Sequence, residues 1–119
     1  METRSLDAAE AFTTKDGSTI RELFGVPTGG TSHQSLAEAM LPPGGTTQRH
    51  YHRRSEEIYF LLEGRADMEL DGEHRELGPG DGVAIPPGAW HEITTVGDSE
   101  VRFLCCCAPP YTHEDTYFE

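Results

Sequence analysis

Hydrophobic and polar residues alternate along much of this chain, in short runs that glycine and proline separate. The clearest run covers residues 65–70, where alanine, methionine and leucine alternate with charged residues. A period of two predicts a β-strand with one buried face. Asp71-Gly72 follows, a pair suited to a type I′ turn, so we expect a hairpin that returns over residues 74–77.

Further short runs between turn residues predict an all-β chain. Their expected strands cover residues 18–24, 35–41, 56–63, 83–85, 90–95 and 101–107. Thirteen glycines and eight prolines suit many strands joined by tight turns, and no run shows a persuasive helical period. At 119 residues the chain is one domain. We place that domain at residues 15–108, with an N-terminal arm at 1–14 and a C-terminal tail or lid at 109–119.

The strand that contains Glu57 has two unlike faces. Glu57 and Tyr59 share one face, whereas Ile58, Phe60 and Leu62 form an entirely apolar second face. A second sheet or the N-terminal arm is one possible cover for that face. An apolar face of this kind commonly marks an interface, so we predict a homodimer.

Charge narrows the range of partners. Nine lysines and arginines stand against 21 aspartates and glutamates, which gives a net charge of −12. That balance argues against nucleic acid and anionic membranes as partners. No apolar run reaches the ~18 residues of a membrane span, and the acidic N-terminus lacks a signal core, so we expect a cytoplasmic protein.

The three cysteines are consecutive, at positions 105–107. Neighbours on a strand point to opposite faces, so no ordinary disulfide joins them. We expect reduced, buried thiols in a cytoplasmic protein, and a thiol that works near a metal is the alternative.

Two segments that begin with glycine carry the candidate chemistry. The first, residues 44–64, contains His50, His52 and Glu57, and the second, residues 80–91, ends at His91. Three imidazoles and one carboxylate are donors that a divalent transition metal takes from proteins, and Fe, Mn, Ni, Cu and Zn all suit them.

Strand geometry indicates how these donors meet. His50 and His52 are two residues apart and share a face, but Glu57 lies at an odd offset from them. We therefore expect a turn at residues 53–55, after which residues 56–63 fold back as a partner strand. His91 then arrives on a later strand, after a turn at residues 86–88.

The spacings G-x5-H-x-H-x4-E-x6-G and G-x5-P-x-G-x2-H resemble the paired motifs of the cupin family. Thr95 stands where that family often has asparagine. The resemblance implies a small jelly-roll barrel, or double-stranded β-helix, of two antiparallel sheets. It also implies metal ligands at the following positions: His50, His52, Glu57 and His91.

The alternation of side chains along a strand suggests which other residues face a ligand. Gln48 shares the face of the two neighbouring histidines, and Tyr59 shares the face of the glutamate, so both are candidates for a substrate pocket. Tyr59 as general acid and His113 as a mobile base are further hypotheses. Arg53 and Arg54, in the expected turn, are candidates to attract an anionic substrate.

Four protein donors leave one or two positions open on such a metal for a small molecule. We therefore predict a mononuclear metalloenzyme acting on a small oxygenated molecule. A dioxygenase and a non-redox isomerase, cyclase or decarboxylase both suit the donors. The alternative is a metal-containing domain that binds or senses a small ligand without turnover.

Overall fold

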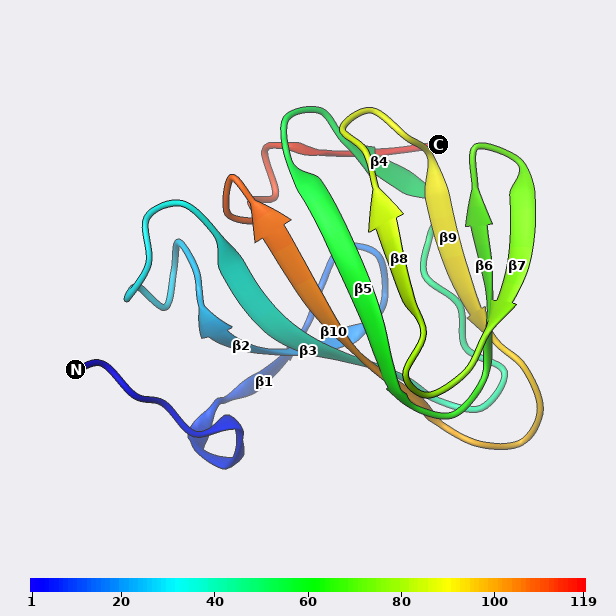
Figure 1. Ribbon diagram of the computed structural model, residues 1–119, viewed down its shortest axis with the longest axis horizontal. Coiled ribbons are helices and arrows are strands. Elements are labelled where there is room, and N and C mark those ends of the chain that lie inside the picture. The colour runs from blue at the N-terminus through cyan, green and yellow to red at the C-terminus, as the bar shows by residue number, and fades with distance from the viewer.

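The computed structural model describes residues 1–119, and all of its regular elements are strands except one short 3-10 helix. Two antiparallel sheets face each other (Figure 1), which confirms the predicted all-β class. The elements are η1 (Leu6–Ala8), β1 (Ala11–Thr13), β2 (Thr19–Phe24), β3 (Ser35–Leu41), β4 (His50–His52), β5 (Glu56–Glu63), β6 (Ala66–Leu70), β7 (Glu73–Leu77), β8 (Gly82–Ile85), β9 (His91–Thr95), β10 (Val101–Ala108) and β11 (Thr116–Phe118). No helix is long and apolar enough to cross a membrane.

The chain passes repeatedly from one sheet to the other. The six-stranded sheet has the order β1-β2-β3-β10-β5-β8, and the five-stranded sheet has the order β11-β4-β9-β6-β7. The expectation that β5 folds back to pair with β4 is therefore wrong, because β4 pairs with β9 and β11 while β5 pairs with β8 and β10. The turn after β4 carries the chain across the barrel instead.

The inward face of the six-stranded sheet changes character along β10. At one end Val101 and Phe103 are fully buried and belong to the hydrophobic core. Towards the other end Cys105 and then Cys107 take the inward positions, and Cys107 pairs in register with Glu57 and Ser35 on the flanking strands. The barrel thus has an apolar half, which supplies stability through burial, and a half with polar groups.

The expected hairpin is present between β6 and β7. Asp71 has φ 47° and Gly72 has φ 90°. A type I′ turn needs positive φ at both central residues, so the turn type predicted from this pair is confirmed.

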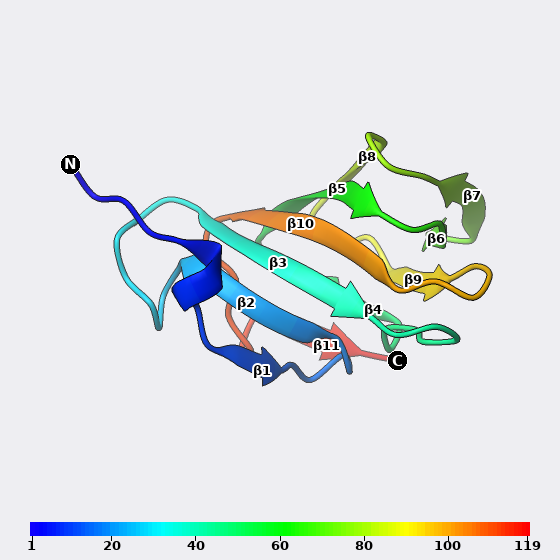
Figure 2. The ribbon, with the colours of Figure 1, turned by 90° about the horizontal axis from the view of Figure 1, so that it is seen from below.

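Both ends of the chain add strands to the sheets (Figure 2). Within the predicted arm, β1 pairs with β2 at the edge of the six-stranded sheet. Within the predicted tail, β11 pairs with β4 and places Thr116 opposite His52. The C-terminal residues therefore contribute to the wall of the barrel beside the histidines.

Candidate metal centre

Three histidines converge inside the polar half of the barrel. His50 and His52 lie on β4, and His91 begins the adjacent strand β9, directly opposite His50 in register. One ring nitrogen from each lies within 4.8 Å of the other two, and all three side chains are buried. A cluster of this kind can hold a metal ion.

The turn before β9 delivers His91 to this position. Gly88 has φ 82°, which glycine adopts without strain. Its backbone N–H donates to the carbonyl of His52 at 2.7 Å. This bond ties the turn to β4, so the strand that follows starts beside the other two imidazoles.

Backbone carbonyls fix the rings of His50 and His91 in the same way. His50 Nδ1 donates to the carbonyl of Gln48 at 2.7 Å, and His91 Nδ1 donates to the carbonyl of Ala89 at 2.9 Å. A carbonyl only accepts, so Nδ1 carries the proton in both rings. The Nε2 atoms, with free lone pairs when the rings are neutral, face the centre of the cluster.

Thr116 on β11 fixes the third ring. Its hydroxyl donates to the carbonyl of Thr112 at 2.8 Å and lies 3.1 Å from His52 Nδ1. Because the hydroxyl proton already points to Thr112, the oxygen accepts from His52 Nδ1–H. His52 Nε2 is thereby left on the side of the cluster, like the Nε2 atoms of the other two histidines.

Glu57 reaches the cluster from the facing sheet. Its Oε1 lies 3.1 Å from His52 Nε2 and 3.5 Å from His91 Nε2. Its Oε2 accepts a hydrogen bond from Cys107 Sγ at 3.1 Å. His52 at Oε1 and the thiol of Cys107 at Oε2 thus give each oxygen of this buried carboxylate a partner, as burial of a charged group requires.

Burial and neighbouring charges set the protonation of these groups. Burial alone raises the pKa of Glu57, but the hydrogen bond and charges of His52 and His91 outweigh it, and the pKa is lowered. Burial lowers the pKa of His52, yet the hydrogen bond and charge of Glu57 dominate and raise it. Burial and the charge of His91 lower the pKa of His50 to about 4. His50 is therefore neutral at pH 7, as a metal ligand must be.

One buried atom in the cluster has no partner. His91 Nε2 makes no hydrogen bond, and its side chain is 0% exposed. Leaving a buried polar atom unpaired costs on the order of 1–3 kcal/mol, and folded proteins rarely accept that cost without a reason. A divalent transition metal bound to this nitrogen would satisfy it, so the donors present fit such an ion.

A cavity of about 50 Å³ adjoins the cluster. Ile20, Ala37, Ala39 and Phe103 form much of its apolar wall. Tyr59 also lines it, and burial raises the pKa of that phenol well above its usual range, so the side chain stays neutral. The space suits a few waters or a small molecule beside an ion.

Two of the predicted site residues lie elsewhere. The Gln48 side chain is exposed and does not line the cavity, because β4 begins only at His50 and strand parity does not extend back to position 48. Its backbone carbonyl, not its amide, serves the site. His113 is also exposed, and its Nδ1 lies 3.2 Å from the Tyr111 hydroxyl rather than in the cavity.

The arginines of the turn after β4 are likewise outside the cavity. Arg53 and Arg54 are both exposed, and neither contributes to the lining. Their positions therefore do not support the expectation that these two arginines attract an anionic substrate into the site.

Sequence reasoning missed several residues that the fold brings into the lining. These are Asp16, Tyr111 and Thr116. Cys105 and Cys107 also line the cavity, in line with the alternative of a thiol near a metal. The cysteines carried a signal, since alternate residues of a strand next to Glu57 must face the same interior. Asp16 and Thr116 carried none, because their approach to the histidines depends on the pairing of distant strands.

Residues 37–107 match the cupin domain family. This segment covers more than half of the chain and contains all four candidate donors, and the chain belongs to that family. The double-stranded β-helix that the cupin resemblance implies is thereby confirmed.

Individual relatives extend over most of the chain. The protein MJ1618 of Methanocaldococcus jannaschii is 48% identical over 110 residues, which are 92% of this chain and 88% of that protein. A Streptomyces cyaneus protein named polyketide synthase CurC is 35% identical over 80% of this chain and 62% of its own length. Among solved structures, the polyketide cyclase RemF from Streptomyces resistomycificus has 28% identity and a TM-score of 0.79, with 97% of this chain and 89% of RemF covered.

Proposed function

We propose that this protein is a metal-dependent enzyme that acts on a small oxygenated molecule by non-redox chemistry of the cyclase or isomerase type. The observation that carries the proposal is the unpartnered, buried Nε2 of His91, which lies in one cluster with His50 and His52, the two imidazoles that line a partly apolar cavity. The similarity to the polyketide cyclase RemF supports the reaction type.

The proposed ligands are His50, His52 and His91 together with Glu57 from the facing sheet. A divalent transition metal bound by these groups supplies a Lewis acid for polarising a carbonyl oxygen. Four protein donors leave room for a substrate oxygen on an ion that accepts five or six.

The chain's own residues do the remaining work. Cys107 holds the carboxylate of Glu57 through Oε2, which leaves Oε1 towards the imidazoles. Tyr59 offers a neutral phenol that donates a hydrogen bond to an oxygen of the substrate. The apolar wall that includes Phe103 excludes bulk water from the reacting centre.

The test is a turnover screen of metal-loaded protein against small carbonyl and hydroxy compounds, run with and without dioxygen. Product formation that does not consume oxygen, and that disappears in His91→Ala, supports the proposal. His33→Ala is the matched control, because His33 is exposed on the loop before β3 and should keep full activity.

Two other outcomes contradict the proposal in different ways. Oxygen consumption coupled to product formation assigns the protein to the dioxygenases instead. Saturable binding of a compound without any product assigns it to the non-catalytic binding domains.

A further inference from the structure

Asp16 places a second carboxylate beside the histidines. It lies in the turn between β1 and β2, and its Oδ1 accepts from Thr14 Oγ1 at 2.6 Å, from Ser18 N at 2.9 Å and from Ser18 Oγ at 2.6 Å. Its Oδ2 lies 3.9 Å from His50 Nε2. One oxygen is therefore clamped by its own turn, and the other faces the nitrogen that His50 presents to the cluster.

The turn that carries Asp16 is joined to the strand of the metal centre. The backbone N–H of Gln48 donates to the carbonyl of Asp16 at 2.8 Å, and the carbonyl of Gln48 orients His50. The position of the carboxylate is thus coupled through a single residue to the position of the imidazole. Ser18, which closes the clamp, is buried.

The carboxylates that line the cavity face no lysine or arginine there. No lysine or arginine contributes to the lining, whereas Asp16, Glu22 and Glu57 do. The charges of Asp16 and Glu57 together balance those of a divalent ion. An anionic ligand would therefore enter a cavity where no cation remains to compensate it, close to two carboxylates.

A neutral molecule with a hydroxyl group brings no further negative charge into the cavity. Asp16 Oδ2 has no hydrogen-bond donor from the protein, so a ligand hydroxyl can donate to it. The apolar wall of Ile20 and Phe103 accommodates the carbon skeleton of such a molecule. His91 does not itself line the cavity, but its unpartnered Nε2 belongs to the same cluster as His50 and His52, which do, and an ion bound there would satisfy it.

We infer that Asp16 determines specificity: it selects neutral molecules that carry a hydroxyl beside a carbonyl and rejects small carboxylate anions. This inference rests on the proposed metal centre and names the class of substrate for it. It does not depend on which reaction, if any, follows binding.

The experiment compares two small probes in cobalt-loaded protein, neutral hydroxyacetone and anionic glycolate. The dissociation constant of each is measured from changes in the visible cobalt spectrum, and the affinity for cobalt is measured separately. In Asp16→Asn the ratio of glycolate affinity to hydroxyacetone affinity should rise about tenfold or more, because a charge is lost while the turn keeps an oxygen acceptor.

Two further variants make the result decisive. Asp16→Ser removes the charge with a different side chain and should raise the same ratio in the same direction. Asp67→Asn removes an equal charge on β6, where the carboxylate contacts exposed His74, and should leave the ratio unchanged.

The outcomes separate this inference from the proposed function. A raised ratio without any turnover supports the specificity role and contradicts the enzymatic proposal. An unchanged ratio in both Asp16 variants overturns the role even if the protein is an enzyme. An equal effect on both probes, or the binding of neither probe to the cobalt-loaded wild type, overturns it too.

Discussion

At the scale of single residues, the site depends on groups that orient the donors. Thr116, Gln48 and Ala89 each accept the Nδ1 proton of one imidazole. Two of the three acceptors are backbone carbonyls, which no substitution removes directly. Thr116, on β11 near the end of the chain, is the exception, because it accepts the proton of His52 Nδ1 with its side-chain hydroxyl.

Replacing Thr116 should weaken metal binding without touching a ligand. Thr116→Val removes the acceptor for His52 Nδ1–H at nearly constant volume, and loss of such a partner typically costs about 10–100-fold in metal affinity. Competition with a chromophoric chelator measures the effect. Thr116→Ser keeps the hydroxyl and should stay near wild type, whereas equal affinities for the valine and serine variants would refute the orienting role.

At the scale of elements, alternation predicted the strands well but not how they join. The runs at residues 35–41 and 56–63 became β3 and β5 with those bounds. The period of two does not indicate which sheet a strand joins, so it predicts a hairpin at the point where the chain in fact crosses from β4 to β5. The short β11 was missed because three residues are too few to show a period.

Parity also placed Glu57 and Tyr59 on an inward face, where the structure has them. The approach of Asp16 to His50 was beyond reach, since 34 positions separate them in the sequence and only the pairing of strands brings them together. The hydrophobic pattern thus predicts which residues face inward. It does not predict which inward residues meet.

The outer face of the six-stranded sheet contains a buried ion-pair network. Glu38 on β3 accepts from Arg21 on β2 and from Arg102 on β10, and the Glu38 side chain is 0% exposed. Burial raises the pKa of Glu38, but the hydrogen bonds and charges of the two arginines outweigh it, and the pKa falls below 4.5. The carboxylate ties three strands together at their centre.

Glu38→Gln should lower the free energy of unfolding by about 2 kcal/mol at pH 7, since it removes the charge that two partly buried arginines share. The folded-state pKa is depressed, so the contribution is fully present above pH 4.5 and disappears as the pH falls through the lower folded value. Urea unfolding at pH 7 and at pH ~3 measures it. Glu63→Gln, which alters an exposed partner of Arg102, is the control. A difference between wild type and Glu38→Gln that does not shrink at low pH would contradict this linkage.

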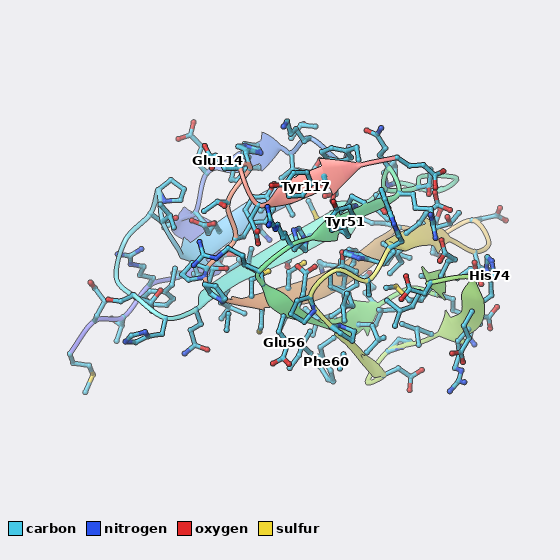
Figure 3. The ribbon with its side chains drawn as sticks, turned by 90° about the horizontal axis from the view of Figure 1, so that it is seen from above. Tyr51, Glu56, Phe60, His74, Glu114 and Tyr117 are labelled. Carbon is cyan, nitrogen blue, oxygen red and sulfur yellow. The ribbon has the colours of Figure 1, made fainter.

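At the scale of the whole molecule, part of the outer face of the six-stranded sheet is apolar. Ile58 is 48% and Phe60 is 41% exposed, so no other part of this chain fully covers them. Leu104 and Cys106 on β10 lie beside them on the same face, because they are the register partners of Phe60 and Ile58. Figure 3 shows Phe60 on one outer side of the barrel and Tyr117 on the other.

We predict that this face joins two copies of the chain, and that Phe60→Lys separates them. A lysine would bury a charge in the interface, which apolar interfaces tolerate poorly. Light scattering after size exclusion should give twice the chain mass of 13.1 kDa for wild type and the single mass for the variant. Tyr117→Lys, on the opposite side of the barrel, should still give twice the chain mass, as wild type does. A monomeric wild type would rule out this interface.

The central claim is that four donors from two sheets bind a single ion, and metal stoichiometry tests it most directly. Protein loaded with a divalent transition metal and dialysed exhaustively should retain one ion per chain by elemental analysis, and His91→Ala should retain almost none. Wild type that retains no metal, or a His91→Ala variant that retains as much as wild type, would contradict the account.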